Sequence, residues 1–375
     1  MSAVLAVDAH NLARIRSGVE VYADNILRHL DAPRFSFRLF SDLPLAEPPV
    51  QGYEILPLPF ASGVTGRNYV GPLWFHWTLA RQAARIRADL LWSPYFFVPL
   101  GSSVPTVATI HDTAPLDSRS RSYPPVWRRY FLWMLAHSAR HARHIIVPSQ
   151  RIADNLQHAF GTPGERISVI PHGVAPEFFA PAEPAAATRL RAALGIDGRF
   201  ILFVGSLGDR KNVITLVRAY AQLPPELQHE CQLVIVGPGG SDEALVRGFL
   251  REAKLGGRVI LAGYLEPRDL VELYKAAELL AFPSLSESFG LPVVEAMAAG
   301  TPVLTSNTSS LPDTAGDAAW LLDPTDVPRW TDALQRTLTE ESLRADLRQR
   351  GLARARLYSW PEAARRHVEV FEACL

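Results

Sequence analysis

Cysteine is scarce in this chain, because only Cys231 and Cys374 occur among its 375 residues. Two cysteines are too few for a disulfide framework and lack the spacing of a metal site, which favours a reducing compartment. No apolar run approaches the roughly 20 residues that a membrane-spanning helix needs. The first apolar run lacks a basic start and stops at Asp8, so we expect no signal peptide. These absences together predict a cytoplasmic protein.

Neither sign of charge is in excess, because 38 basic residues balance 38 acidic ones. A balanced chain gives no reason to expect a nucleic-acid partner, which would require a basic surface. Lysine supplies only three of the basic residues, Lys211, Lys254 and Lys275. A lysine in a polar loop is therefore a candidate functional residue. No Asp-x-Asp pair is placed to bind a metal ion, and we expect no metal to be required.

The length and pattern of the chain predict two α/β domains. Short apolar runs alternate with amphipathic ones, which is typical of parallel sheets covered by helices. Two such series predict two doubly wound domains, each binding ligands at the carboxyl ends of its strands. The pattern predicts strands near residues 4–7, 37–40, 90–92, 106–110, 144–147, 167–170, 200–204, 233–236, 259–261, 279–282 and 303–305, and helices near 19–30, 73–87, 126–142 and 150–160.

Composition marks the boundary between the domains. Residues 175–187 are rich in proline and alanine and lack strand character, which is typical of a linker. We therefore assign residues 1–178 to the first domain and residues 179–356 to the second. Residues 357–375 are predicted to form a final helix, with Ser359 as its N-cap.

The most informative segment carries two glutamates eight positions apart, in the sequence Glu-Ser-Phe-Gly-Leu-Pro-Val-Val-Glu. Glu287 is predicted on the loop after a strand, and Glu295 about one turn inside the following helix. Two carboxylates beside an anion site suit a nucleotide sugar, which has hydroxyl groups on both sides of its diphosphate. The anion site would consist of backbone N–H groups that point out of the helix N-terminus, those of Phe289, Gly290 and Leu291.

A second polar loop follows the strand predicted at 200–204. It begins at Gly205 and carries Arg210 and Lys211 at the entrance of a helix. Cations at a helix N-terminus oppose the helix dipole, so we expect an anion such as a pyrophosphate to compensate them. A later glycine-rich loop at 234–240 is either a tight turn or a close approach to a nucleotide base.

These segments together resemble the retaining glycosyltransferases of family 4. The resemblance implies the GT-B fold, in which two Rossmann-like domains face a central cleft and the last helix crosses back to the first domain. It also implies that the first domain binds the acceptor and the second the donor. By the same resemblance Glu295 binds the ribose, Glu287 contacts the donor sugar, and Arg210 and Lys211 bind the diphosphate. Many family members have an arginine directly after Gly205, where this chain has a serine.

Two segments of the first domain resemble further motifs of this family. Gly18 and Val19, after the first strand, resemble the glycine loop that lies against the donor phosphate, although Ser17 replaces its first glycine. His111 and Asp112, past the fourth predicted strand, resemble the His-Asp motif whose histidine lies beside the reacting centre. We expect His111 to donate a hydrogen bond to a sugar hydroxyl or a phosphate oxygen. Asp112 either orients His111 or caps the next turn.

Residues 118–153 contain no acidic residue, and aromatic residues are interleaved with their arginines. Arginine and aromatic side chains on a helix suit peripheral contact with a membrane that carries anionic lipid. They suit a prenyl-diphosphate-linked acceptor equally well, and an ordinary helix with its aromatic side chains in the core is the third interpretation.

The resemblance predicts a retaining transferase that moves a hexose from a nucleotide-diphosphate sugar to a saccharide or lipid-linked saccharide. Its motifs look most like those of bacterial mannosyltransferases of O-antigen and polysaccharide synthesis, which favours GDP-mannose as donor. No cofactor beyond this donor is expected. The alternatives are a UDP-sugar transferase or a nucleotide-sugar epimerase on the same fold, and a catalytically silent sugar-binding scaffold. A glycan phosphorylase is disfavoured because Lys254 and Lys275 are predicted inside helices.

Overall fold

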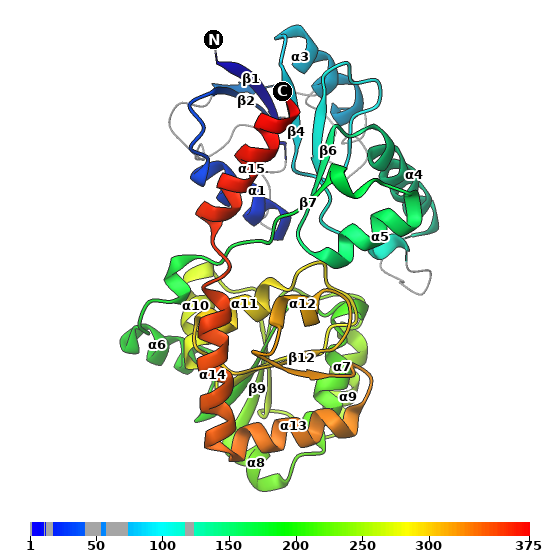
Figure 1. Ribbon diagram of the computed structural model, residues 1–375. Coiled ribbons are helices and arrows are strands. Elements are labelled where there is room, and N and C mark those ends of the chain that lie inside the picture. The colour runs from blue at the N-terminus through cyan, green and yellow to red at the C-terminus, as the bar shows by residue number, and fades with distance from the viewer. Residues whose placement is uncertain (1, 11, 13–17, 42–53, 58–73, 117–123) are drawn as a thin grey trace. The chain divides into compact units, whose positions relative to one another are not determined.

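The computed structural model describes residues 2–10, 12, 18–41, 54–57, 74–116 and 124–375. The chain divides into two compact units (Figure 1). Unit 1 contains the described residues up to Gly173 together with Trp360–Leu375, and unit 2 is Val174–Ser359. The boundaries predicted at 178 and 356 lie a few residues from these points, and the acceptor and donor roles of the two domains stay predictions.

Unit 1 is built on a parallel sheet in which the first strand lies between the second and the fourth. The chain order reverses at this position, which makes the carboxyl ends of these strands a switch point where such sheets bind ligands. The order across the sheet is β3 (Glu54–Pro57), β2 (Phe35–Ser41), β1 (Ala3–Asp8), β4 (Leu90–Ser93), β5 (Thr106–Thr109), β6 (His144–Val147) and β7 (Ile167–Val169).

Helices connect and cover these strands. The last helix of the chain packs beside the first one within unit 1 (Figure 1). The helical elements are α1 (Gly18–His29), the π-helical η1 (Trp74–Leu79), α3 (Ala80–Arg85), η2 (Ala114–Leu116), α4 (Pro125–His141), α5 (Gln150–Phe160), η3 (Gly164–Arg166) and α15 (Trp360–Cys374).

Unit 2 repeats the same topology with a second parallel sheet. Its order is β10 (Val259–Gly263), β9 (Cys231–Val236), β8 (Arg199–Val204), β11 (Leu279–Phe282), β12 (Val303–Ser306) and β13 (Trp320–Leu322). The switch point of this sheet therefore lies between β8 and β11. The central strands are almost completely buried, as expected for a parallel sheet with both faces covered.

The helices of unit 2 follow the strands in regular alternation. They are η4 (Pro176–Phe178), α6 (Pro184–Leu194), η5 (Asp209–Lys211), α7 (Val213–Ala221), α8 (Pro225–Glu230), α9 (Glu243–Glu252), α10 (Pro267–Ala276), α11 (Leu291–Ala298), α12 (Leu311–Ala315), α13 (Val327–Thr339) and α14 (Glu341–Ala355). Within the described ranges of both units, no helix is long and apolar enough to cross a lipid bilayer.

The predicted α/β pattern is confirmed strand by strand, with ends shifted by no more than two residues. Two short strands were missed, β3 and β13, because three or four residues give too little periodicity to detect. The helix predicted at 73–87 is in fact the π-helical η1 followed by α3.

Two local expectations were wrong. The predicted linker, 175–187, contains the start of α6, because Pro184 suits the first turn of a helix and the alanines after it favour helix. Lys254 lies beyond α9 in a left-handed conformation with φ 54°, not inside a helix. The argument that disfavoured a phosphorylase therefore rests on Lys275 alone, which does lie in α10.

The glycine loop after β9 packs directly against the loop after β8. A Cβ atom at Gly237 would lie 2.2 Å from the carbonyl oxygen of Gly205, and one at Gly240 would lie 2.5 Å from the carbonyl group of Leu207. Gly237 also has a φ of 141°, which side chains rarely allow. Of the two interpretations of this loop, a tight backbone packing is the one that the structure explains, since these contacts fix the loop that begins at Gly205.

The Gly237→Ala variant is expected to lose about 3 kcal/mol of unfolding free energy, because the new methyl group overlaps a backbone carbonyl. Gly248→Ala is the matched control, since Gly248 lies inside α9 with nothing within 4 Å of its would-be Cβ. That control should gain roughly 0.5 to 1 kcal/mol. Urea unfolding measures both changes, and equal stabilities of the two variants would contradict the packing described.

Candidate active site

The donor-site residues predicted in the second domain lie around the switch point of unit 2. Gly205 directly follows β8, and Glu287 lies on the loop after β11, the strand that pairs with β8. The two loops are hydrogen-bonded to each other, because the carbonyl oxygen of Arg210 accepts from the N–H of Leu285 at 2.8 Å. Two segments far apart in the sequence thus form one polar edge.

Lys211 and Glu287 form an ion pair at this edge. The ammonium Nζ of Lys211 donates to Oε1 of Glu287 at 2.6 Å, and the hydroxyl of Ser284 donates to the same oxygen at 2.6 Å. The ammonium also lies 5.1 Å from the centre of the Phe282 ring. The Lys211 side chain is 20% exposed and that of Glu287 is 13% exposed. The pair is therefore held in place but still reachable by a ligand.

Backbone contacts fix both partners of this pair. The carbonyl oxygen of Glu287 accepts hydrogen bonds from the hydroxyls of Ser309 at 2.5 Å and Ser310 at 2.8 Å. Asn212, next to Lys211, has a left-handed φ of 52°, and its amide donates to the carbonyls of Pro283 and Pro324. Side-chain amides and hydroxyls thus hold the two loops in addition to their backbone hydrogen bonds.

The N-terminus of α11 follows a glycine in a left-handed conformation. Gly290 has a φ of 98° and a would-be Cβ 2.7 Å from Leu311, so glycine is required where the loop becomes a helix. The backbone N–H groups of Gly290 and Leu291 donate to no other described residue. Phe289 is buried, and its carbonyl oxygen accepts from the hydroxyl of Thr314. The N–H groups of Gly290 and Leu291 are therefore available as anion-binding donors.

Glu295 lies in α11 with a partly buried side chain. The hydroxyl of Tyr274 donates to its Oε2 at 2.8 Å, and no other described residue donates to its carboxylate. Burial raises the pKa of Glu295 to about 7, and the Tyr274 hydrogen bond opposes that rise. The carboxylate thus keeps unused acceptor capacity at a cost to stability, which is the arrangement expected of a ligand-binding acid.

Unit 1 holds the remaining predicted site residues. His111 is buried, and its Nε2–H donates to the carbonyl oxygen of Pro94 at 2.8 Å. Burial lowers the pKa of His111 to about 4, so the ring is neutral and its Nδ1 is left as an acceptor. In this tautomer His111 can meet a ligand only as an acceptor, through Nδ1, whereas the sequence led us to expect a donor; its contact with a sugar stays a prediction.

The two interpretations of Asp112 are now distinguished. Its Oδ1 accepts the backbone N–H of Ala114 at 2.7 Å, so Asp112 caps the η2 turn. Gly18 and Val19 form the start of α1, as predicted, with Gly18 exposed. Ser17 lies outside the described residues.

Unit 1 is expected to lose stability as the pH falls below 6.5. Burial lowers the pKa of both His111 and His367 to about 4, whereas an unfolded histidine titrates near 6.5. The unfolded state therefore binds protons first, and each residue removes up to about 3 kcal/mol between pH 6.5 and 4, with no effect above that range. Calorimetry between pH 4.5 and 8 measures this loss. His111→Gln should flatten the profile, whereas the exposed control His158→Gln should not; identical profiles would contradict the assignment.

Several supporting residues were not predicted. Ser284 lies just before the segment from Glu287 to Glu295 but carried no signal of its own, and Tyr274 lies in a helix whose pattern indicates only a core position. Tyr22 packs its ring against His111, with 4.5 Å between ring centres. These residues become visible only when the strand order brings separate segments together.

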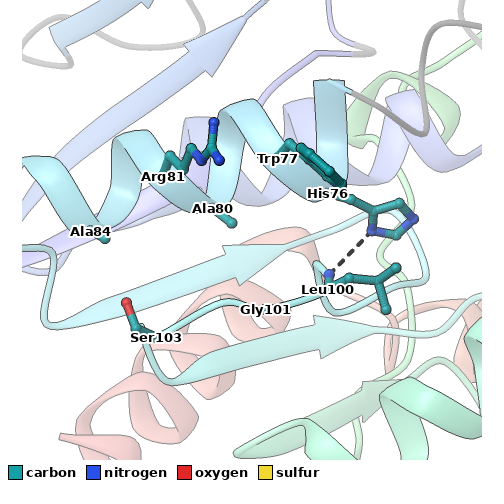
Figure 2. Close-up of a pocket in the computed structure, with 8 residues that line it drawn as sticks. All are labelled: His76, Trp77, Ala80, Arg81, Ala84, Leu100, Gly101 and Ser103. Carbon is teal, nitrogen blue, oxygen red and sulfur yellow. Dashed lines mark hydrogen bonds between the residues drawn. The ribbon is translucent and has the colours of Figure 1, made fainter.

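A hollow of about 460 Å³ lies elsewhere in unit 1, and no predicted site residue lines it. Figure 2 shows it between the helical segment that carries Trp77 and Arg81 and the loop at Gly101. The guanidinium of Arg81 lies 5.7 Å from the centre of the Trp77 ring, and Trp77 is 58% exposed. His76 connects this segment to α4, because its Nε2 lies 2.9 Å from the Tyr130 hydroxyl.

Two sequence families match the chain. The family described as glycosyl transferases group 1 matches residues 187–354, and the family described as glycosyltransferase family 4 matches residues 16–178. The O-antigen chain mannosyltransferase B of Escherichia coli is 30% identical over 71% of this chain and 70% of that protein. The chain belongs to glycosyltransferase family 4.

Other relatives of this family-4 chain carry different names. The D-inositol 3-phosphate glycosyltransferase of Acidothermus cellulolyticus is 30% identical over 96% of this chain and 86% of that protein. The serotype-specific mannosyltransferase WbdA of Escherichia coli is 31% identical, and the chain spans only about a third of its length. The relatives share glycosyl transfer, and their names do not agree on one substrate.

Solved structures confirm that this family-4 chain has the GT-B fold. Sucrose-phosphate synthase of Thermosynechococcus elongatus superposes with a TM-score of 0.81 at 22% identity, covering 99% of this chain and 98% of the other. HepE of Anabaena, solved in complex with UDP and glucose, gives a TM-score of 0.76 at 18% identity, covering 99% and 100%.

Proposed function

We propose that the protein is a retaining hexosyltransferase that transfers mannose from GDP-mannose to a saccharide or lipid-linked saccharide acceptor. The observation that carries this proposal is the Lys211–Glu287 ion pair at the switch point of unit 2. Lys211 supplies a cation there and Glu287 a carboxylate, and the N-terminus of α11 supplies backbone N–H groups that are unpaired within the described residues. Glu295 adds a second acid within α11. This set matches the diphosphate, the sugar hydroxyls and the ribose of a nucleotide sugar.

The charges of the site suit the bond that must break. The bond between the anomeric carbon and the β-phosphate oxygen breaks, and its electron pair leaves with the diphosphate. Lys211, Arg210 and the N–H groups of Gly290 and Leu291 stabilise that negative charge. The acceptor oxygen forms the new bond on the same face of the sugar, and its proton passes to the departing phosphate. Glu287 and His111 position the sugar through its hydroxyl groups.

The nucleotide base of the donor has two candidates, guanine and uracil. The relative named O-antigen chain mannosyltransferase B favours GDP-mannose for this chain. The structure of HepE with UDP and glucose favours a UDP-sugar as the second candidate. Because both donors present the same diphosphate and ribose, the described contacts of Lys211 and Glu295 serve either one, and the experiment has to separate them.

The acceptor side of the proposal rests on the surface of unit 1. One face of α4 exposes Val126, Arg129, Trp133 and Arg140, at spacings that align them on a helix. An exposed cationic and aromatic face on a helix that contains no acidic residue supports contact with a prenyl diphosphate or an anionic membrane. The first part of the 118–153 segment, up to Tyr123, lies outside the described residues. The cytoplasmic location of the protein stays a prediction.

Donor turnover tests the proposed function. The purified protein is incubated with GDP-mannose or UDP-glucose, without added metal, and with water or an oligomannoside as acceptor. Release of the nucleoside diphosphate is followed by chromatography, and proton NMR records the configuration of the first sugar product. We expect GDP release with retained α configuration.

The other outcomes separate the alternatives. UDP release from UDP-glucose would show that the second candidate, a UDP-sugar, is the donor. A new nucleotide sugar without released diphosphate would indicate an epimerase. Tight nucleotide binding without turnover of any donor would support the catalytically silent scaffold and contradict the transferase.

A further inference from the structure

A buried chain of hydrogen bonds in unit 1 begins at the last helix of the protein. His367 of α15 places its Nδ1 2.6 Å from the carbonyl oxygen of Ala363, so this nitrogen must donate. The ring is neutral because burial lowers its pKa to about 4, and its Nε2 is therefore an acceptor. The Tyr22 hydroxyl, 2.5 Å away, donates to that nitrogen. The tautomer of His367 thus fixes the direction of the Tyr22 hydroxyl.

The chain continues to the sheet. Thr109, the last residue of β5, places its hydroxyl 3.0 Å from that of Tyr22, and the indole N–H of Trp92 donates to Thr109 at 3.1 Å. Every group in this series of hydrogen bonds has a defined donor or acceptor role once the Tyr22 hydroxyl points to His367. A fully satisfied buried network of this kind holds its members in one arrangement.

The candidate catalytic histidine, His111, packs against the ring of Tyr22. The tyrosine ring lies edge-on to His111, with ring centres 4.5 Å apart and an interplanar angle of 76°. It lies edge-on to His172 as well, at 5.0 Å, and the two imidazoles stack on each other at 5.6 Å. His111 follows Thr109 by two residues, so the network fixes it through both the strand end and the Tyr22 ring.

The same network reaches the start of α1. Tyr22 lies on α1 one turn after Gly18, where the helix begins. α15 packs beside α1 in unit 1 (Figure 1), and Glu372 near its end pairs with Arg34 at 3.3 Å. The last helix of the chain therefore contacts α1, which begins at the predicted donor-binding Gly18. It also contacts Tyr22, whose ring packs against the candidate catalytic His111.

We propose that His367 is a positioning residue for sugar transfer, which acts through Tyr22 on His111 and on the start of α1. This inference rests on the proposed function, since it assigns a role within that reaction. It explains why a titratable residue is buried in a helix outside both sheets: an apolar residue would remove the acceptor at 2.5 Å and let the Tyr22 hydroxyl turn toward Thr109. The reaction would then proceed with His111 held less firmly.

Steady-state kinetics of His367→Leu and His367→Gln test the proposal. Leucine removes the acceptor, whereas the glutamine side-chain oxygen can replace Nε2. We expect His367→Leu to lower kcat about 10- to 100-fold, as misplaced catalytic groups do, and His367→Gln to recover most of that loss. Nucleotide affinity, measured calorimetrically with GDP, should fall by a smaller factor than kcat in both, because the donor contacts proposed for Lys211 and Glu295 lie in unit 2.

Val370→Ala is the matched control, because Val370 is buried on the same helix and takes no part in the hydrogen bonds. It should lower the melting temperature while preserving kcat. Equal kcat losses in His367→Leu and Val370→Ala, or an unchanged kcat in His367→Leu, would overturn the proposal. If His367→Leu does not fold, Tyr22→Phe removes the hydroxyl alone and should show the same loss of kcat. An inactive wild-type protein would instead defeat the proposed function itself.

Discussion

Replacing Lys211 by alanine is expected to lower kcat for sugar transfer by a factor of about 10² to 10³, the usual effect of removing one preorganised group that stabilises a leaving anion. Its ammonium is the partner of Glu287 at 2.6 Å and is held over the Phe282 ring, so its position does not depend on the ligand. The alanine variant also leaves Glu287 with a neutral donor, Ser284, in place of a cation. Single-turnover kinetics with saturating donor measure this loss.

Lys254→Ala is the control for Lys211→Ala. Lys254 is exposed and belongs to the same unit, but it lies beyond α9 rather than at the switch point. Its removal should leave kcat within a factor of two of wild type. Equal kcat values for Lys211→Ala and wild type would show that the ion pair is only structural.

Glu295→Gln is expected to change stability and affinity in opposite directions. Burial raises the pKa of this acid to about 7, so the folded state at pH 8 carries a partly buried carboxylate that the unfolded state would ionise freely. Glutamine imitates the protonated form and can still accept from Tyr274. The variant should therefore gain about 1 to 3 kcal/mol of unfolding free energy at pH 8. Its affinity for nucleotide should fall about 10- to 100-fold, because a charged acceptor of the ribose hydroxyls is lost.

The pH dependence gives this prediction its sign. A raised folded-state pKa means that stability from the protonated acid is present below pH 4.5 and is lost as the pH rises through 7. The stability difference between variant and wild type should accordingly shrink on acidification and vanish near pH 4.5. Nucleotide binding by wild type should tighten as the pH rises through 7.

Chemical unfolding and calorimetric binding at pH 5, 6.5 and 8 measure both effects. Glu226→Gln, an exposed substitution on α8, is the control and should change neither quantity. A Glu295→Gln variant that is destabilised at pH 8, or that keeps wild-type affinity, would contradict the role assigned to this acid.

The parts of the site that the sequence predicts are those encoded locally. Gly290 marks the point where a loop becomes a helix, and the spacing from Glu287 to Glu295 follows from strand, loop and helix periodicity. Gly205 and Lys211 were located in the same way, as a strand end and the polar loop after it. A short stretch of chain contains all the information that these placements need.

The contacts that complete the site depend on the order of the strands. Lys211 and Glu287 are 76 residues apart, and they meet because β8 pairs with β11. Tyr22 and His367 are 345 residues apart, and only the family resemblance, not a local pattern, led us to expect the last helix to return to the first domain. The protonation of His111 also depends on burial, which is why the sequence alone did not indicate that its Nδ1 is left as an acceptor.

The central claim is that the polar edge formed by Lys211, Glu287 and Glu295 binds the diphosphate and ribose of a nucleotide sugar. Calorimetric titration of the wild-type protein with GDP, UDP and ADP, without metal, tests it most directly when Lys211→Ala and Glu295→Gln are titrated alongside. Micromolar binding of one nucleotide that is lost or strongly weakened in both variants is the predicted result, with GDP the expected ligand. Absence of binding by any nucleotide, or binding that both variants retain, would contradict the account.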